Sequence, residues 1–220
     1  MFRGWLVYRW YLFYWEDDSS MVAKPCILIR HKVDALEALH KRVSSPRLSG
    51  EVDASVLANI FRAALRAPDH AQLRPWRFLT VSGESRQQLG ELFARARLQE
   101  DPSLTTAELL KVKNKPMRAP MLIVAIVSFK EHPKVPEVEQ ILSTGAAVQN
   151  MLVAAFAQGV GAMWRTGSLT YNKMVIEGLG LVDGEAVAGF LYLGEPEGSM
   201  KTIKELDIKE FTAEWSYQPV

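Results

Sequence analysis

Two nearly continuous apolar runs constrain the fold of this chain more than any other sequence feature. Met121 to Val127 and Ala186 to Leu193 have the length of strands and do not alternate with polar residues. For Met121 to Val127 the pattern predicts a strand that is covered on both faces. Because amphipathic segments lie between and before these runs, we expect one layered domain of strands covered by helices.

Hydrophobic spacing places the other elements. Apolar residues at helical intervals predict helices over 34–42, 53–67, 106–113, 138–158 and 172–179, and shorter runs predict strands over 76–82 and 160–164. Another helix should start near Ser85, which has the spacing of a capping box with Gln88. Gly159 is expected to end the long helix in a left-handed conformation. No repeat or low-complexity linker divides this series of elements.

The first twenty residues have an unusual composition. Eight of the 21 aromatic residues of the chain lie within positions 1–15. Arg9 interrupts the apolar run, which is too short to span a bilayer and lacks a signal-peptide cleavage pattern. Three interpretations stay open: an anchor at a membrane interface, a tail that packs on the domain or a partner, and translated upstream sequence before a start at Met21. We favour the third, because the segment has neither helical nor strand periodicity, and we expect it to be poorly packed.

Charge and cysteine content exclude several classes of protein. Lys and Arg total 26 against 25 Asp and Glu, and no basic run is present, which argues against a nucleic-acid partner. Cys26 is the single cysteine, so an intrachain disulfide is impossible, and no Cys/His spacing indicates a metal site. We therefore expect a cytoplasmic protein without a metal, membrane or nucleic-acid partner. GxSxG, HExxH and Walker patterns are also absent.

Three loops place polar or cationic groups at the edges of apolar elements: 41–47, 66–76 and 164–168. In the first, Arg42 and Ser44 have the chemistry of a phosphate clamp, although a solvated helix end would look the same. The second is a constrained connector that suits ligand binding, or a rigid turn with Trp76 in the core. In the third, Arg165 either faces a planar anionic ligand or pairs with a helix end.

The order of these motifs resembles the FMN-dependent nitroreductase family. The match is carried by Lys41-Arg42-x-Ser44, Arg66-Ala67-Pro68-Asp69-His70 with Pro75-Trp76-x-Phe78, Ala157-Gln158-Gly159-x-Gly161 with Trp164-Arg165-Thr166-Gly167, and Gly189-Phe190-Leu191-Tyr192-Leu193-Gly194-x-Pro196. Within the family, the chain is most similar to a compact bacterial branch of NAD(P)H nitroreductases. The resemblance covers 33–196, so we expect 1–32 to be an extension outside it and 197–220 to be a tail that packs on a partner subunit.

The resemblance implies an α+β (mixed α/β) fold: a three-layer sandwich with a central mixed sheet flanked by helices. It also implies a homodimer with FMN sites built from both chains. By position, the FMN contacts would be Arg42, Val43, Ser44, Trp164, Arg165 and Thr166 of one chain with Arg66 and His70 of the other. NAD(P)H would lie near Ala154, Ala155, Phe156, Ala157, Gln158 and Gly159.

Two positions depart from the family pattern. The family commonly has a second arginine where Val43 stands, so Lys41 or Arg47 would have to substitute for it. It usually has glutamine where Arg74 stands, which affects any flavin contact from that side chain.

The resemblance further implies that hydride chemistry takes place on the flavin, without a catalytic side chain or metal. NAD(P)H would reduce the flavin, and a nitroaromatic, quinone or other small acceptor would reoxidise it in a ping-pong cycle. Arg165, Arg42 or the second chain's Arg66 would stabilise charge on the reduced ring. The alternatives are a related flavin reductase such as a dehalogenase or enal reductase, a noncatalytic FMN-binding protein, and a dimeric interaction module without flavin.

Overall fold

The chain divides into two compact units, residues 1–32 and residues 33–220, and each is described here by itself. The computed structural model describes residues 6–8, 11–16, 20–25, 34–199 and 201–217. Cys26 lies outside the described residues.

Three short strands make up the described part of the first unit. They are β1 (Leu6–Tyr8), β2 (Tyr11–Glu16) and β3 (Ser20–Pro25), and they pair in antiparallel fashion in the order β1-β2-β3. The sequence has neither helical nor strand periodicity here and did not predict these strands. Their signal is compositional, because aromatic residues favour strands.

The second unit is built on a five-stranded sheet. Its strands are β4 (Leu48–Ser49), β5 (Trp76–Ser82), β6 (Met121–Ser128), β7 (Gly161–Arg165) and β8 (Glu185–Pro196). β8 pairs with β6 along one edge and with β7 along the other, and its last residues pair with β4, while β5 pairs with the far edge of β6. The two apolar runs of the sequence thus became β6 and β8, the inner strands.

Every pairing of the described strands in this sheet is antiparallel, whereas a mixed sheet was expected. The connection from β5 to β6 shows why. It contains two helices that pack on each other, so the chain returns to the end of β5, and Met121 at the start of β6 pairs with Ser82 at the end of β5. A single crossover helix would instead have favoured a parallel neighbour.

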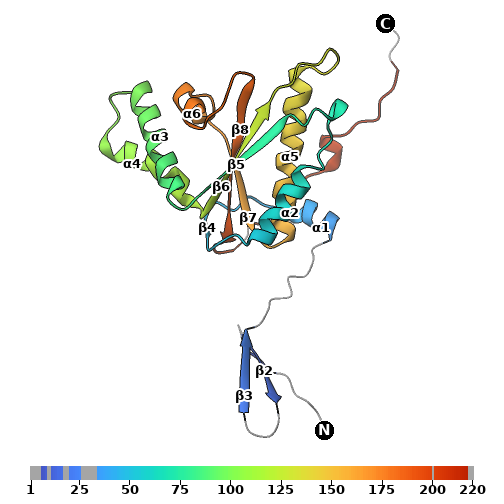
Figure 1. The fold of residues 1–220 in the computed structure, drawn as a ribbon. Helices are drawn as coiled ribbons and strands as arrows, with labels where there is room; N and C mark the ends of the chain where they lie inside the picture. The colour runs from blue at the N-terminus through green and yellow to red at the C-terminus, as the bar shows by residue number, and fades with distance from the viewer. Residues whose placement is uncertain (1–5, 9–10, 17–19, 26–33, 200, 218–220) are drawn as a thin grey trace. The chain divides into compact units, whose positions relative to one another are not determined.

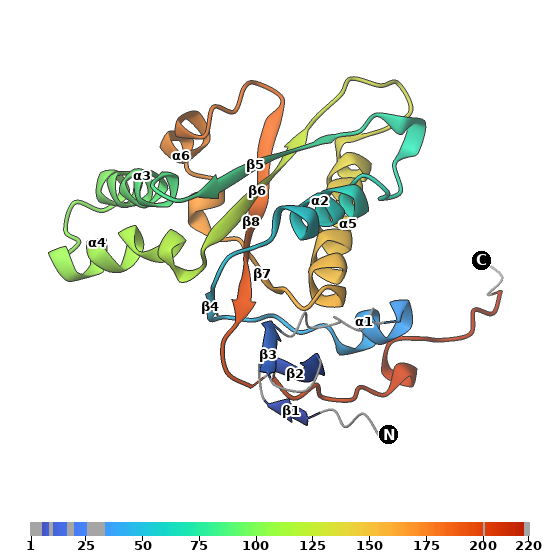
Figure 2. The ribbon, with the colours of Figure 1, turned by 60° about the horizontal axis from the view of Figure 1, so that its bottom comes forward.

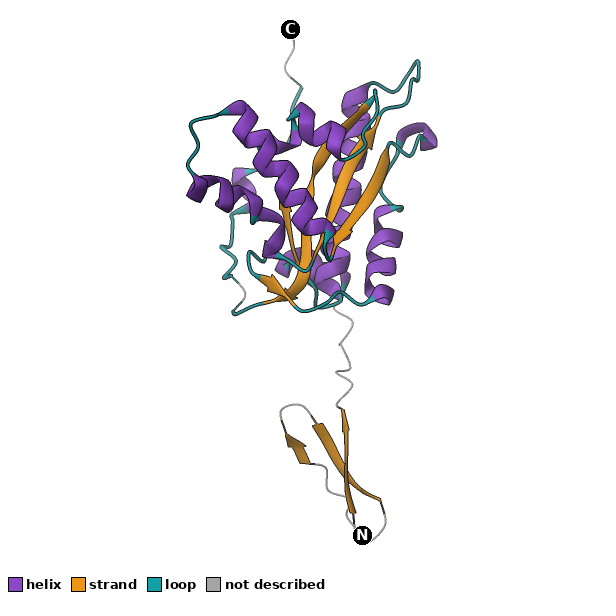
Figure 3. Cartoon of the chain, turned by 60° about the vertical axis from the view of Figure 1, so that its left-hand side comes forward, coloured by secondary structure: helices purple, strands orange, loops and turns teal. Residues whose placement is uncertain are grey.

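Helices cover both faces of the sheet (Figures 1 and 3). On one face lie α3, α4 and α6, and on the other lie α1, α2 and α5 (Figures 1 and 2). Their bounds are α1 Ala35–Lys41, α2 Ala54–Ala64, α3 Ser85–Glu100, α4 Thr106–Lys113, α5 Glu137–Ala157 and α6 Lys173–Gly178. The expected three-layer α+β sandwich is confirmed.

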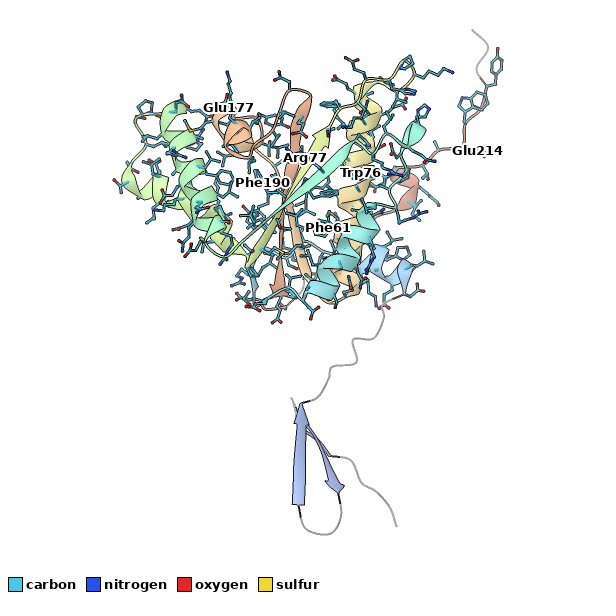
Figure 4. The ribbon with its side chains drawn as sticks, in the orientation of Figure 1. Phe61, Trp76, Arg77, Glu177, Phe190 and Glu214 are labelled. Carbon is cyan, nitrogen blue, oxygen red and sulfur yellow. The ribbon has the colours of Figure 1, made fainter. Side chains whose placement is uncertain are left out.

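Alternating residues of β6 and β8 divide the core in two, as side chains on a strand must. Leu122, Val124 and Phe190 pack against α3 and α6, and Ile123 and Leu191 pack against α2 and α5. Figure 4 shows Phe190 on the side of α3, with Phe61 and Trp76 on the side of α2. The sheet is therefore covered on both faces, which explains the unbroken apolar runs.

The long helix α5 is long and apolar enough to cross a membrane by length and composition alone. Its role in this fold is different, because Ala147, Val148, Met151 and Ala155 are completely buried in the core. It was expected over 138–158 and ends where Gly159 takes a φ of 74°.

The capping box lies elsewhere than expected. α3 does begin at Ser85, but its N-cap is Glu84, which makes no capping hydrogen bond. Thr105 and Glu108 form the capping box instead, at the start of α4. Glu84 already has helical backbone angles, so Ser85 lies inside the helix and its spacing to Gln88 has no capping role.

Candidate functional site

The first candidate loop follows α1 and lies against the start of β7. The N–H of Ser45 donates to the carbonyl of Ala162 at 3.0 Å, which fixes the loop on the strand. Gly161 permits this approach, since a Cβ there would lie 2.6 Å from a Leu48 methyl and 3.1 Å from the Cβ of Ser45. Arg42, Val43 and Ser44 are held half-buried in this loop.

The same place receives the end of α5. Arg42, Val43 and Ser45 line a cavity of about 210 Å³ together with Phe156 and Gly159, and the rest of its wall is Leu152, Val160, Gly161, Ala162 and Pro196. The structure therefore brings Arg42 and Val43 to one cavity with Phe156 and Gly159 of the expected nicotinamide segment, whereas Ser44 is not part of its wall. Apart from Arg42 and Ser45, the side chains around it are apolar.

Gln158 is fixed within this part of the fold. Its amide donates to the carbonyl of Ala154 at 2.8 Å, and its side-chain oxygen accepts from Asn59 on α2 at 2.9 Å. Ala155 is completely buried. Of the expected nicotinamide segment, Phe156 and Gly159 are therefore the positions that reach the cavity wall.

The second loop, between α2 and β5, has a strained backbone. Ala71, Gln72 and Arg74 have φ angles of 59°, 53° and 50°, in the left-handed region that costs non-glycine residues energy. The carboxylate of Asp69 accepts from the N–H of Arg74 at 2.6 Å and holds this conformation. Arg66 and Arg74 line an open cavity of about 500 Å³ with Leu65, Ala67, Asp69, Gln72 and Trp76.

His70 does not share that cavity. Its Nδ1 lies 2.7 Å from a carboxylate oxygen of Glu139 on α5, and both side chains are about half exposed. The pair fastens the second loop to the start of α5. It leaves Nε2 as the ring nitrogen through which His70 could contact a further group.

The third candidate segment leaves the end of β7 and is shaped by a β-bulge in β8. The register shifts opposite Ala125 and Ile126, where Gly189 and Val187 are their partners and Ala188 is the extra residue. The Ala188 carbonyl accepts from the indole N–H of Trp164 at 3.2 Å. Gly189 makes room for that indole, since a Cβ there would lie 2.2 Å from its nitrogen.

Arg165 lies on the opposite face of β7 from Trp164, as neighbours on a strand do. Its guanidinium carbon is 5.3 Å from the centre of the Tyr192 ring, and its Nε is buried without a hydrogen-bond partner among the described residues. A cavity of about 370 Å³ adjoins it, lined by Phe93, Lys115, Arg118, Met163, Trp164, Arg165, Thr166, Gly167, Ser168, Leu169, Phe190 and Tyr192.

Six of the eight predicted FMN residues line three cavities of the described chain: Arg42 and Val43 line one, Arg66 lines a second, and 164–166 line a third. Ser44 and His70 lie outside these three walls. Lys115 and Arg118 were missed by the sequence analysis. They lie in a short 3-10 turn between α4 and β6, Lys115-Pro116-Met117-Arg118, and two cations around a proline are a weak signal without the fold. Of the suggested substitutes for a second arginine, Lys41 is paired with Glu37 at 2.7 Å.

Comparison with known proteins identifies the family. The family model described as "Nitroreductase family" matches residues 49–195, which include most of the sheet and both later loops. The chain belongs to the nitroreductase family. A relative from Escherichia coli (strain K12), named "Putative NAD(P)H nitroreductase YdjA", is 39% identical to this family member over 166 residues, which are 75% of this chain and 90% of the relative.

Solved structures support the same assignment of the fold. A nitroreductase-like family protein from Bacillus cereus matches this nitroreductase-family chain with a TM-score of 0.70 and 25% identity, covering 82% of this chain and 95% of the other. A protein from Desulfovibrio desulfuricans described as "a putative nitroreductase in complex with fmn" matches with a TM-score of 0.64 and 22% identity, covering 84% of this chain and 98% of the other. The resemblance seen in the sequence motifs is confirmed, and the family makes the protein an oxidoreductase.

Proposed function

We propose that this protein is an FMN-dependent oxidoreductase that uses NAD(P)H to reduce small flat acceptors, such as nitroaromatics or quinones. The observation that carries the proposal is the cavity at the start of β7. There the loop at 42–45 meets the end of α5, two segments about 110 residues apart that family resemblance assigns to FMN and NAD(P)H.

The residues present fit the phosphate and ribityl end of FMN. Arg42 offers a half-buried guanidinium, and Ser44 and Ser45 offer hydroxyl groups from the same loop. Arginine with neighbouring hydroxyls is a favourable donor set for a phosphate. Val43 supplies no charge, and because Lys41 is held by Glu37, Arg47 would have to serve as the second cation of this loop.

The 210 Å³ cavity holds only part of a flavin, and we infer that a second copy of the chain completes the site. Arg66 and His70 of that copy would reach the flavin, consistent with the open cavity beside Arg66 and the strained loop that presents it. Residues 164–166 would approach from the first chain, with the Trp164 indole held in place by Ala188. Backbone strain of this kind is characteristic of functional loops.

Bound FMN would supply the redox chemistry, accepting a hydride from NAD(P)H and passing the electrons to the acceptor. The chain would bind and orient the reactants. Phe156 and the apolar wall would exclude water, while Arg42 would offset the phosphate charge. Because one apolar opening has to admit the nucleotide and then the acceptor, we expect a ping-pong cycle. We also propose that the enzyme acts in the cytoplasm.

The test is an anaerobic half-reaction. Purified protein saturated with FMN should show a flavin spectrum, bleach when NADH or NADPH is added, and regain its colour with nitrofurazone or a benzoquinone. Parallel double-reciprocal plots are expected. Bound flavin that neither nucleotide bleaches would indicate a noncatalytic FMN-binding protein, and a colourless protein that does not take up FMN would contradict the proposal altogether.

A further inference from the structure

The cavity on the α3 face of the sheet contains two cations, Lys115 and Arg118, that the proposed flavin chemistry does not use. Its wall includes the three cations Lys115, Arg118 and Arg165 and, among the residues that the structure describes, no carboxylate. In the described part of the chain, acidic partners are found for other cations nearby: Arg97 pairs with Glu100, and Lys113 pairs with Glu91.

The positive charges of the three cations influence the same groups in this cavity. Burial and the nearby charges of Arg118 and Arg97 lower the pKa of the Lys115 ammonium. Burial raises the pKa of the Tyr192 hydroxyl, while the positive charges of Arg165 and Arg118 oppose that rise. Both arginines therefore lie close enough to Tyr192 for their fields to reach its oxygen. Gathering like charges in a partly buried place is unfavourable unless an anion balances them.

The donors around the cavity suit an oxyanion. The Nε of Arg165 is buried and lacks a hydrogen-bond partner among the described residues, although such groups normally have one. Thr166 and Ser168 add hydroxyl groups on the loop beyond β7. Phe93 and Phe190, packed edge to face at 5.3 Å, form an apolar floor that would take a carbon skeleton.

We propose that this cavity is a second ligand site, which binds the phosphoryl group of a small phosphate monoester between Lys115, Arg118 and Arg165. Its wall includes residues 164–166, which are also expected flavin contacts, but Phe93, Phe190 and Tyr192 place it on the α3 face of the sheet. The cavity beside Arg42 lies at the end of α5 and shares no wall residue with it. The inference goes beyond the proposed flavin chemistry. The backbone of 164–166 can still serve the flavin while the Arg165 side chain serves the second ligand.

The experiment is a calorimetric titration of FMN-loaded protein, freed of excess FMN, with inorganic phosphate and with phenyl phosphate, in chloride buffer of constant ionic strength. Saturable binding is expected for both, tighter for phenyl phosphate because of the aromatic floor. The Lys115→Met and Arg118→Met variants should each bind at least tenfold more weakly. Lys115→Arg, which keeps the charge, should bind within about threefold of the unchanged protein.

Two control variants distinguish a local phosphate site from a general effect of charge and from the flavin loop. Lys113→Met removes a nearby charge that already has Glu91 as its partner, and Arg42→Met alters the proposed flavin loop; neither should weaken phosphate binding. Equal weakening by Lys113→Met would reduce the effect to net charge and overturn the proposal. The proposal would also be overturned if only Arg42→Met lost phosphate binding, or if Lys115→Arg and Lys115→Met weakened it equally. Absence of saturable binding to the unchanged protein would overturn it as well.

These outcomes are independent of catalysis. The heat of phosphate binding is measured whether or not NAD(P)H reduces the protein, so failure of the proposed redox function leaves this result readable. Conversely, reduction of nitrofurazone without any phosphate binding would support the proposed function and contradict the second ligand site.

Discussion

Arg42 is the residue on which binding of the flavin phosphate should depend most. It stands half-buried at the cavity that also contains Phe156, and Val43 beside it supplies no second charge. Arg42→Met should weaken FMN binding about tenfold or more, because a hydrogen bond to a charged group contributes about 1.5–3 kcal/mol. Fluorescence titration of the apoprotein with FMN measures the change.

Lys41→Met is the matched control. It removes the neighbouring charge, but Lys41 is already paired with Glu37 at 2.7 Å on the surface of α1. FMN affinity should stay within about twofold, as is typical when an exposed pair is lost. Equal losses of FMN affinity in the two variants would show that Arg42 does not bind the flavin phosphate.

Glu185 makes stability depend on pH. Its carboxylate is almost fully buried and accepts two hydrogen bonds of 2.6 Å from Arg77, and this pairing lowers its pKa. A lowered folded-state pKa contributes stability above the unfolded value of about 4.3, and the contribution is lost as pH falls through the folded pKa. Thermal melts should therefore show falling stability below about pH 5.

Glu185→Gln should destabilise the protein at pH 7 by about 2 kcal/mol, since it leaves the Arg77 guanidinium without its counter-charge. Its stability should also depend less on pH in the acid range. If the stability of Glu185→Gln fell with pH in the same way as that of the unchanged protein, a group other than Glu185 would cause the loss of stability in acid.

At the scale of elements, one side chain fastens α5 to the chain that follows β6. Gln140 is 2% exposed; its oxygen accepts from the N–H of Lys130 at 2.8 Å, and its amide donates to the Lys130 carbonyl at 2.9 Å. Gln140→Leu keeps the size but leaves these backbone groups unpaired. The free energy of unfolding should fall by about 2 kcal/mol in urea denaturation.

Gln87→Ala, on the exposed side of α3, is the comparison, and it should change stability by less than about 0.5 kcal/mol. If Gln140→Leu lowered the free energy of unfolding equally little, water would be taking over the hydrogen bonds of the amide. The position of α5 would then depend on its apolar face alone.

At the scale of the whole molecule, the C-terminal tail has apolar side chains without cover from its own domain. Phe211 is 69% exposed and Trp215 is 81% exposed, with Ile203, Leu206 and Ile208 also open. Exposed apolar residues in such number favour an interface, and we propose that they pack on the second copy. A chain ending at Gly198 should shift from dimer to monomer in sedimentation and lose FMN affinity.

A dimer that survives this truncation would show that other surfaces hold the subunits together. The double variant Phe211→Ser with Trp215→Ser tests the same contact without shortening the chain, and it should weaken the dimer in the same direction.

The first unit lies outside the match to the family model, which begins at residue 49. A chain beginning at Met21 should therefore bind FMN as tightly as the full chain and melt at the same temperature within about 2 °C. Fluorescence titration and calorimetry measure both. Loss of flavin binding in the shortened chain would make the aromatic segment part of the functional molecule.

The sequence by itself determined the family and most of the elements. Strong local signals carried these predictions: unbroken apolar runs for β6 and β8, helical spacing for α5, and the ordered motifs around Arg42, His70 and Trp164. Such signals are local because they reflect hydrogen bonding and burial along one element. Strand direction was harder, since it depends on how α3 and α4 return the chain to the end of β5.

Only the tertiary structure decided which candidate residues meet. Arg42 and Phe156 share a cavity although they are far apart in sequence, while Trp164 and Arg165 are adjacent in sequence and face opposite sides of the sheet. Lys115 and Arg118 gave only a weak signal in the sequence, and the fold places them in the wall of one cavity with Arg165. The physical reason is that pairing of β7 with β8 fixes which face each side chain takes, and the covering helices then decide which distant groups share that face.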